Sequence, residues 1–210
     1  MSLFKKHKWP SLTPEEIRKR ARILVIDDSE FYYLDLFKKD GYAIDKWDDV
    51  DDLQKLERGE YDVILLDIQG VGKEQSADQG FGILKHLRHV NPTQIIIAYS
   101  NADWNLQYQD FFRMADATLS KGSDYVDFKR HVDELLMEKF SMGFYVAKIV
   151  YLATPYVNDK EKLQKAAERA ILSRDINILK RYTEKNIDKA EIAKLVLQIA
   201  QVAIGIATLL

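Results

Sequence analysis

The chain alternates short apolar runs with amphipathic stretches, and one run, Tyr61–Asp67, stands out. It is uniformly apolar from Val63 to Leu66 and ends in a carboxylate. A short apolar run rich in branched residues predicts a strand buried on both faces, as in a parallel sheet between two layers of helices. In such sheets ligands bind beyond the carboxyl ends of the strands, and Asp67 stands at such an end.

The remaining pattern predicts four more strands and the helices between them. The other predicted strands are Ala21–Ile26, Tyr42–Trp47, Thr93–Tyr99 and Ala117–Ser120. Apolar residues at helical spacing predict helices over Ser29–Lys39, Asp49–Arg58, Phe81–Val90, Trp104–Met114 and Asp124–Phe140. Five strands alternating with five helices predict an α/β fold with a doubly wound, five-stranded parallel sheet. Right-handed crossovers then place all carboxyl ends of the strands on one edge.

Three carboxylates meet at that edge. The first strand ends in Asp27 and Asp28, and we expect both to lie near Asp67. Like charges at such short range raise one another's pKa values unless a cation is present, and Mg2+ is the natural occupant of an all-oxygen site. Asp27 and Asp28 could instead cap the following helix, since Asp is a preferred N-cap. Three carboxylates at two strand ends favour the metal site.

Two further strands end in polar side chains, Ser100 and Lys121. Together with the carboxylates these groups suit phosphoryl transfer. Asp67 can act as the nucleophile, a metal on Asp27 and Asp28 can neutralise phosphoryl oxygens, and Lys121 adds a positive charge. Ser100 can donate a hydroxyl hydrogen bond to the new phosphoryl group.

Residues 21–140 resemble a receiver domain of the two-component response-regulator family, which has a flavodoxin-like fold. The matching segments are ILVIDD, YDVILLD, GFGILKHLR, IIIAYS and ATLSK. The resemblance implies that Asp67 is the phosphoacceptor and that Asp27 and Asp28 bind Mg2+, helped by the backbone carbonyl of Gln69. It also implies that Ser100 is the switch hydroxyl and Lys121 the phosphate-sensing lysine.

The sequence departs from the family pattern in three places. The stretch from Asp67 to Gly80 is longer than usual, and Gly122 stands where the family usually has proline. The aromatic residue expected three positions before the lysine is Thr118. Tyr99 is a candidate substitute, although strand alternation should turn its ring to the face opposite Ser100.

Charge divides the chain into three parts. Residues 1–22 carry seven Lys and Arg against two Glu, a net charge of +5. Residues 23–140 have a net charge of −11, and residues 141–210 have +4. We therefore expect a basic arm and short helix over 1–20, a receiver domain over 21–140 and a helical region over 141–210.

The chain has no cysteine, and its basic start lacks the apolar core of a signal peptide, so we expect a cytoplasmic location.

The C-terminal region has no recognisable effector motif, and its helices are the notable feature. Apolar residues of the last helix follow a heptad seam, formed by Ile192, Leu195, Ile199, Val202, Ile206 and Leu209. That seam must be covered, by the chain's own helices over 141–182 or by a second copy in a homodimer. The uncharged run Leu195–Leu210 is about 24 Å long as a helix. This is shorter than a hydrocarbon core of about 30 Å, so a membrane contact is a weaker alternative and a span is not expected.

These observations predict a signalling protein rather than an enzyme. We expect a response regulator in a phosphorelay that takes a phosphoryl group from a histidine kinase or phosphotransfer protein. The alternative is a phosphorylation-independent pseudo-receiver that acts as a scaffold. A small phosphatase with an aspartate nucleophile fits less well, because its two aspartates stand one residue apart whereas Asp27 and Asp28 are adjacent. The basic arm Phe4–Trp9 could contact nucleic acid or lipid headgroups, or it could lie as a flexible terminus on the acidic receiver, and we do not expect nucleic acid as a partner.

Overall fold

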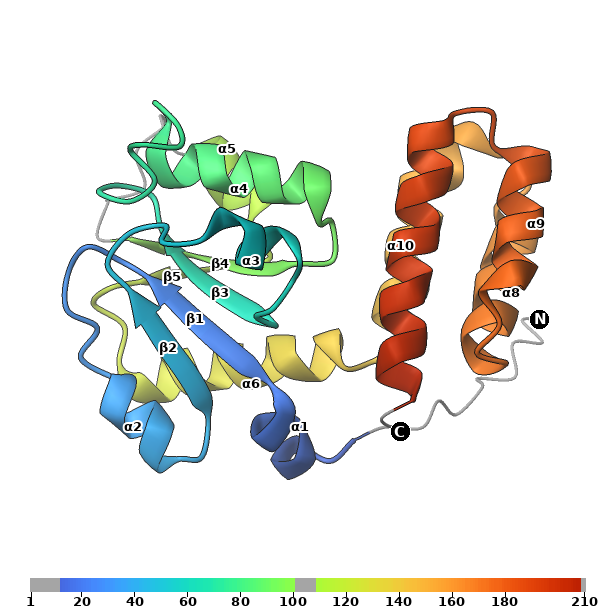
Figure 1. The fold of residues 1–210 in the computed structure, drawn as a ribbon. Coiled ribbons are helices and arrows are strands. Elements are labelled where there is room, and N and C mark those ends of the chain that lie inside the picture. The colour runs from blue at the N-terminus through green and yellow to red at the C-terminus, as the bar shows by residue number, and fades with distance from the viewer. Residues whose placement is uncertain (1–11, 101–108, 209–210) are drawn as a thin grey trace. The chain divides into compact units, whose positions relative to one another are not determined.

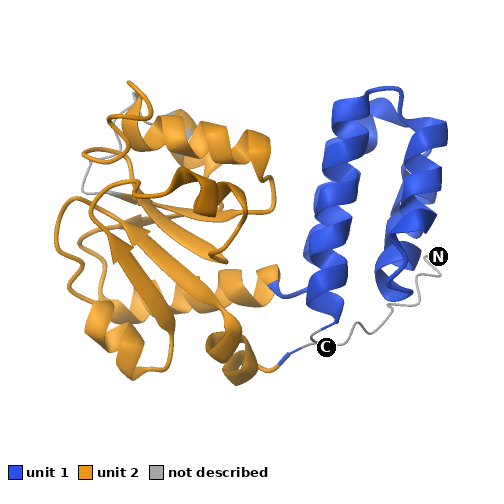
Figure 2. Cartoon of the chain, viewed as in Figure 1, with its two compact units in different colours: residues 1–12, 140–210 blue, residues 13–139 orange. Residues whose placement is uncertain are grey.

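The computed structural model describes residues 12–100 and 109–208. The arm Phe4–Trp9 and the first part of the predicted helix Trp104–Met114 lie outside these ranges. The chain forms two compact units (Figure 2). Residues 13–139 make up one, called here the sheet unit. The described residues 140–208, with Leu12, belong to the other, called the helical unit.

The sheet unit is built on a five-stranded sheet in which all neighbouring strands are parallel (Figure 1). The strands are β1 Arg22–Ile26, β2 Ala43–Trp47, β3 Val63–Asp67, β4 Ile95–Ser100 and β5 Ala117–Ser120. Their order across the sheet is β2-β1-β3-β4-β5. The predicted doubly wound fold is therefore confirmed. All five residues of β3 are buried, as its unbroken apolar run predicts.

Helices cover both faces of the sheet. They are α1 Pro14–Arg20, α2 Leu34–Lys39, α3 Leu53–Glu57, α4 Gln79–Val90, α5 Gln109–Met114 and α6 Tyr125–Lys139. Figure 1 shows α2 and α6 on one face and α3, α4 and α5 on the other. One apolar cluster lies under α3 and α4 and includes Leu24, Ile64, Leu66, Leu84 and Ile96, all fully buried. Each such side chain contributes about 1.5–3 kcal/mol when buried, so the cluster fixes the strands that carry the polar edge.

Two helices begin later than the sequence predicts. The expected start of α2 at Ser29 is wrong, since the helix begins at Leu34. In the segment before α2, the Phe31 ring packs edge-on against the ring of Tyr99 on β4. The expected start of α3 at Asp49 is also wrong, because the Asp49 carboxylate instead accepts hydrogen bonds from the backbone N–H groups of Val50 and Gly72.

A polar network ties α1 to α6. Helix α1 begins with a capping box between Thr13 and Glu16. Further along, Arg18 Nη2 lies 3.3 Å from Asp133 Oδ2 on α6, and Lys129 Nζ lies 3.1 Å from the same oxygen. The Tyr42 hydroxyl donates to the other Asp133 oxygen. Burial alone would raise the pKa of Asp133, but these hydrogen bonds and charges outweigh it and hold the pKa below its ordinary value.

The helical unit contains four helices, α7 Met142–Ala153, α8 Lys160–Leu172, α9 Ile176–Asn186 and α10 Ala190–Ala207. A short 3-10 turn, Thr154–Tyr156, follows α7. Helices α8 and α9 are separated at residues 173–175, where Arg174 adopts a positive φ of 56°. Helix α10 starts at the N-cap Lys189, whose side chain makes no capping hydrogen bond.

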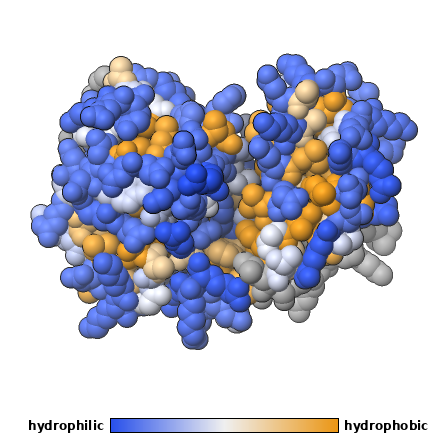
Figure 3. Space-filling view, in the orientation of Figure 1, coloured by the Kyte–Doolittle hydropathy of each residue, from blue (hydrophilic) through white to orange (hydrophobic). Residues whose placement is uncertain are grey.

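Helix α10 packs against α7, α8 and α9, so its covering by the chain's own helices is confirmed in part. Its buried face shares Ile199 and Ile206 with the predicted seam but otherwise differs from it. The buried residues are Val196, Ile199, Ala200, Ala203, Ile204 and Ile206. Val202 is 43% exposed, and Leu209 lies outside the described residues. Apolar side chains are visible over α10 in Figure 3. By length and composition α10 could cross a membrane, a property that core helices of soluble proteins share.

The Asp133 network predicts a pH-dependent contribution to stability. Asp133→Asn should lower the free energy of unfolding of the sheet unit by roughly 1–3 kcal/mol at pH 7, because a charged hydrogen-bond acceptor is lost. The folded-state pKa lies below the ordinary value of 3.8. The contribution is therefore complete above that value and is lost as the pH falls through the folded-state pKa. Urea unfolding of both proteins at pH 7 and pH 3 measures this.

The matched control is Asp127→Asn, a more exposed carboxylate on the same helix that pairs with Arg130. Its removal should change the free energy of unfolding by less than about 0.5 kcal/mol. Equal losses in the two variants, or an Asp133→Asn loss that does not shrink at low pH, would contradict the network's role.

Candidate phosphoryl-acceptor site

The carboxyl ends of β1 and β3 bring the three predicted carboxylates together. Ile26 on β1 pairs with Leu66 on β3, so the next residues, Asp27 and Asp67, are neighbours. One oxygen from each of Asp27, Asp28 and Asp67 lies within 4.8 Å of the others. Asp27 and Asp67 are buried, whereas Asp28 is exposed. The register of two parallel strands therefore produces the cluster expected from the sequence.

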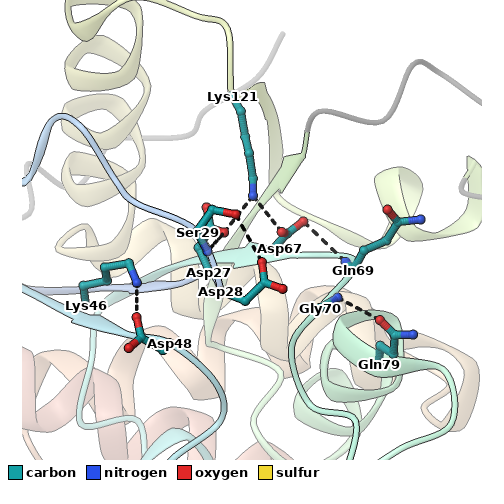
Figure 4. A network of polar contacts seen from close by, with 10 residues as sticks. All are labelled: Asp27, Asp28, Ser29, Lys46, Asp48, Asp67, Gln69, Gly70, Gln79 and Lys121. Atoms are coloured by element: carbon teal, nitrogen blue, oxygen red, sulfur yellow. Dashed lines mark hydrogen bonds and ion pairs between the residues drawn. The ribbon is translucent and has the colours of Figure 1, made fainter.

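Lys121, which follows β5, reaches into this cluster (Figure 4). Its Nζ lies 2.7 Å from Asp27 Oδ1 and 2.7 Å from Asp67 Oδ2. Burial lowers the pKa of the Lys121 ammonium, but its two carboxylate partners raise it by more, so the group is charged at neutral pH. Burial raises the pKa of Asp67, and the hydrogen bond from Lys121 opposes that rise only in part.

One oxygen of the buried Asp27 lacks a partner. Its Oδ1 accepts hydrogen bonds from Lys121 and from the Ser29 backbone N–H, the latter at 2.9 Å. Its Oδ2 is buried without a hydrogen-bond partner in the described part of the chain. A buried carboxylate oxygen left in this way costs about 1–3 kcal/mol or more. Three carboxylates, one of which has an unpartnered oxygen, form a set of oxygen ligands that suits a hard divalent cation such as Mg2+.

Two glycines allow the chain after β3 to close against the acids. Gly70 has a φ of +88°, and a Cβ there would lie 2.1 Å from Asp28 Oδ2. A Cβ on Gly80 would lie 1.9 Å from the Asp67 carbonyl oxygen. The Gly70 N–H donates to Gln79 Oε1 at 2.8 Å. Any side chain at either glycine would push the loop or the carboxylates out of place.

The loop between β3 and α4 is also held from the side. The Gly72 N–H donates to Asp49, and Gln75 Nε2 donates to the Val50 carbonyl at 3.2 Å. A pocket of about 540 Å³ opens on this loop, lined by residues that include Gln69, Lys73, Gln79 and Phe81. The sequence signals the loop by its length and three glycines, but the contact with Asp49 joins residues too far apart for a local pattern to predict.

The other predicted site residues lie as follows. The Gln69 N–H donates to Asp67 Oδ1 at 3.4 Å, and the role of the Gln69 carbonyl stays a prediction. Ser100 ends β4 opposite Ser120, but its side chain lies outside the described part of the structure. Tyr99 is buried, and the Lys121 ammonium lies 5.2 Å from the centre of its ring. The expectation that strand alternation turns the Tyr99 ring to the face opposite Ser100 stays a prediction, because the Ser100 side chain is not described.

A backbone contact connects the site to β2. The Asp27 N–H donates to the Trp47 carbonyl oxygen at 3.1 Å. The Trp47 ring packs edge-on against Tyr61, with the ring centres 5.7 Å apart. Sequence patterns give no sign of this contact, because it depends on the β1–β2 register.

Solved structures similar to this chain include receiver domains and response regulators. A CheY-like receiver from Methanospirillum hungatei JF-1 is 24% identical, with a TM-score of 0.47, and the match covers 57% of this chain and 95% of that one. CheY4 from Vibrio cholerae is 19% identical, with a TM-score of 0.44, over 55% of this chain and 98% of that one. The response regulator TrrA from Thermotoga maritima, solved in complex with Mg2+-BeF, is 25% identical with a TM-score of 0.44, over 55% and 98%. No family model and no curated protein matches the sequence.

The sheet order β2-β1-β3-β4-β5 and the acidic cluster at the strand ends agree with the resemblance predicted from the sequence. The matches to solved structures cover rather more than half of the chain. The helical unit is an addition to that fold.

The close approach at Gly80 predicts that this position tolerates no side chain. Gly80→Ala should lower the free energy of unfolding by about 1–3 kcal/mol, because the new Cβ meets a backbone carbonyl that cannot move away cheaply. Gly122→Ala is the control, since a Cβ there would lie 3.5 Å from the nearest atom, Ser120 Oγ, an ordinary contact. Urea unfolding measures both, and a Gly80→Ala variant as stable as Gly122→Ala would disprove the close approach.

Proposed function

We propose that this chain is a response regulator that accepts a phosphoryl group on Asp67 in a Mg2+-dependent reaction. The donor would be a histidine kinase or a phosphotransfer protein of a two-component phosphorelay. One observation carries the proposal: the Asp67 carboxylate stands at a strand end between the Lys121 ammonium, 2.7 Å away, and the Asp27/Asp28 pair. The proposal assigns the chain to signalling in the cytoplasm rather than to turnover of a substrate.

The two Asp67 oxygens are suited to different tasks. Oδ2 is held by Lys121 at 2.7 Å, whereas Oδ1 accepts a long hydrogen bond, 3.4 Å, from the Gln69 N–H. Oδ1 is therefore the oxygen that attacks phosphorus, and the bond from phosphorus to the donor atom breaks as the acyl phosphate forms. Lys121 keeps Oδ2 in place and lies close enough to balance charge on the incoming group.

Asp27, Asp28 and Asp67 would hold the Mg2+, with the Gln69 carbonyl as a further ligand. When bound, the ion supplies positive charge that offsets the phosphoryl oxygens. The unpartnered Asp27 Oδ2 supports this assignment, because ligation would satisfy an oxygen that otherwise bears the cost of burial. Transmission of the phosphorylated state would pass to the helical unit, whose four helices could also form a homodimer.

A second function, a phosphorylation-independent scaffold, is favoured by two residues. Thr118 stands where receivers usually have a switch aromatic residue, and Gly122 stands where they usually have proline. Both changes concern the output of a receiver. The residues proposed for the chemistry are all present in the sequence: Asp27, Asp28, Asp67, Ser100 and Lys121. The phosphorylation assay below separates the two functions.

Incubation with acetyl phosphate and Mg2+ should add one phosphoryl mass to the protein, and Asp67→Asn should abolish the gain. Intact-mass spectrometry measures the product. Asp62→Asn is the matched control, because this carboxylate precedes the opposite end of the same strand and accepts a hydrogen bond from the Arg22 N–H. It should leave the gain unchanged. A wild-type protein that stays unmodified would favour the scaffold, and a phosphoryl gain in the Asp67→Asn variant would place the phosphoacceptor elsewhere.

Mg2+ should raise the melting temperature of the wild-type protein and act much less on Asp28→Ala. Ligands that bind only the folded state stabilise it by about 2.7 kcal/mol at a hundredfold excess over the dissociation constant. Asp51→Ala is the control, an exposed carboxylate outside the cluster. Thermal unfolding with and without Mg2+ gives the shift for each protein. The same shift in all three would locate the ion outside the cluster.

A further inference from the structure

The Tyr99 side chain provides one wall of the position that Lys121 occupies. The residue is 4% exposed, and the Lys121 ammonium lies 5.2 Å from its ring centre. We propose that Tyr99 is a positioning residue for Lys121, whose ring face keeps the ammonium between the carboxylates of Asp27 and Asp67. The role in phosphorylation rests on the function proposed above, but the positioning itself does not.

The ring face adds an attraction that the carboxylates do not supply. A cation within about 6 Å of an aromatic ring centre is attracted to its face, and the effect grows when the cation is shielded from water. The Lys121 side chain is only 12% exposed. Lysine also has a long, flexible stem, so two carboxylates on one side leave the ammonium free to swing unless another surface restricts it.

The ring is fixed by neighbours that belong to the site's own loops. Phe31, four residues beyond Asp27, packs edge-on against Tyr99 with ring centres 5.9 Å apart. Phe128 on α6 does so at 5.4 Å and is fully buried. Tyr33 contacts both of these rings, and its hydroxyl donates to the Ser123 carbonyl at 2.9 Å. The aromatic group therefore touches the loop that carries Asp27 and the loop that carries Lys121.

This arrangement differs from the one that the resemblance implies. The position three residues before Lys121 on β5 is Thr118, which has no ring. Tyr99 comes from the neighbouring strand β4, where it pairs with Asp67 on one side and Leu119 on the other. A purely structural aromatic residue would stabilise the fold without affecting the ammonium, and the two roles can be separated by experiment.

The test compares Tyr99→Leu, which removes the ring, with Tyr99→Phe, which keeps it, in the full chain. Each protein is treated with a trace amount of an amine-acylating ester, and the rate of Lys121 modification is measured by peptide mass spectrometry. Tyr99→Leu should be modified at Lys121 roughly five- to thirty-fold faster than the wild type, because the ammonium is released more often. Tyr99→Phe should match the wild type.

Lys139 is the control within the same molecule. It is 6% exposed and donates to the Thr93 carbonyl at 2.6 Å, so its modification reports general loosening of the sheet unit. Faster modification of Lys121 alone supports positioning by the ring. A Lys121 rate in Tyr99→Leu equal to the wild type, or a rise matched at Lys139, would overturn the proposal and leave Tyr99 a core residue.

A second measurement uses phosphorylation by acetyl phosphate at several concentrations. If Tyr99 positions Lys121, Tyr99→Leu should lower the maximal rate more than it raises the half-saturating concentration, and Tyr99→Phe should restore the rate. A rate unchanged in Tyr99→Leu would argue against the proposal. If even the wild-type protein gains no phosphoryl group, the proposed function fails, and the labelling result still decides the role of Tyr99.

Discussion

Mutual repulsion among Asp27, Asp28 and Asp67 is the constraint on which the arrangement of the sheet edge depends. Two like charges about 4 Å apart repel by roughly 4 kcal/mol at an effective dielectric constant of about 20, a large fraction of the 5–15 kcal/mol that stabilises a domain. Lys121 offsets part of this repulsion by bridging two of the acids. The remaining repulsion is opposed by the packing of the buried strands and of the loop that contains Gly70 and Gly80. These elements hold the carboxylates in positions where a cation can bind between them.

The sequence was sufficient to predict the strands and the residues that end them. Apolar runs such as Val63–Leu66 identify buried strands, and parallel topology then brings Asp27 and Asp67 to one edge without further information. The conformation of the loop after β3 could not be predicted from the sequence, because it depends on a hydrogen bond to Asp49, a residue far away in the sequence. Strand alternation predicts the face of the sheet on which the Tyr99 side chain lies. It does not predict that the long Lys121 side chain reaches the Tyr99 ring.

The helical unit shows a different limit of sequence patterns. Periodicity predicted that α10 is a helix with a buried stripe, but it could not decide between two stripes of similar apolar character. Large residues suggested a face that includes Val202, whereas the buried face includes Ala200 and Ala203. Alanine contributes little to a hydrophobic pattern, yet a small side chain allows neighbouring helices to come close. The partners of a helix, rather than its own sequence, decide which face is covered.

The contact between the Asp27 N–H and the Trp47 carbonyl has a practical consequence. Trp47 is the only tryptophan in the described residues. It ends β2 next to Asp27, whereas its indole ring packs against Tyr61, which precedes the opposite end of β3. A change at Asp27 would be transmitted through one backbone hydrogen bond to the residue that carries a strong natural fluorophore. With Trp9 and Trp104 replaced by phenylalanine, the emission of the remaining indole would report events at the acidic cluster in real time, without an attached dye.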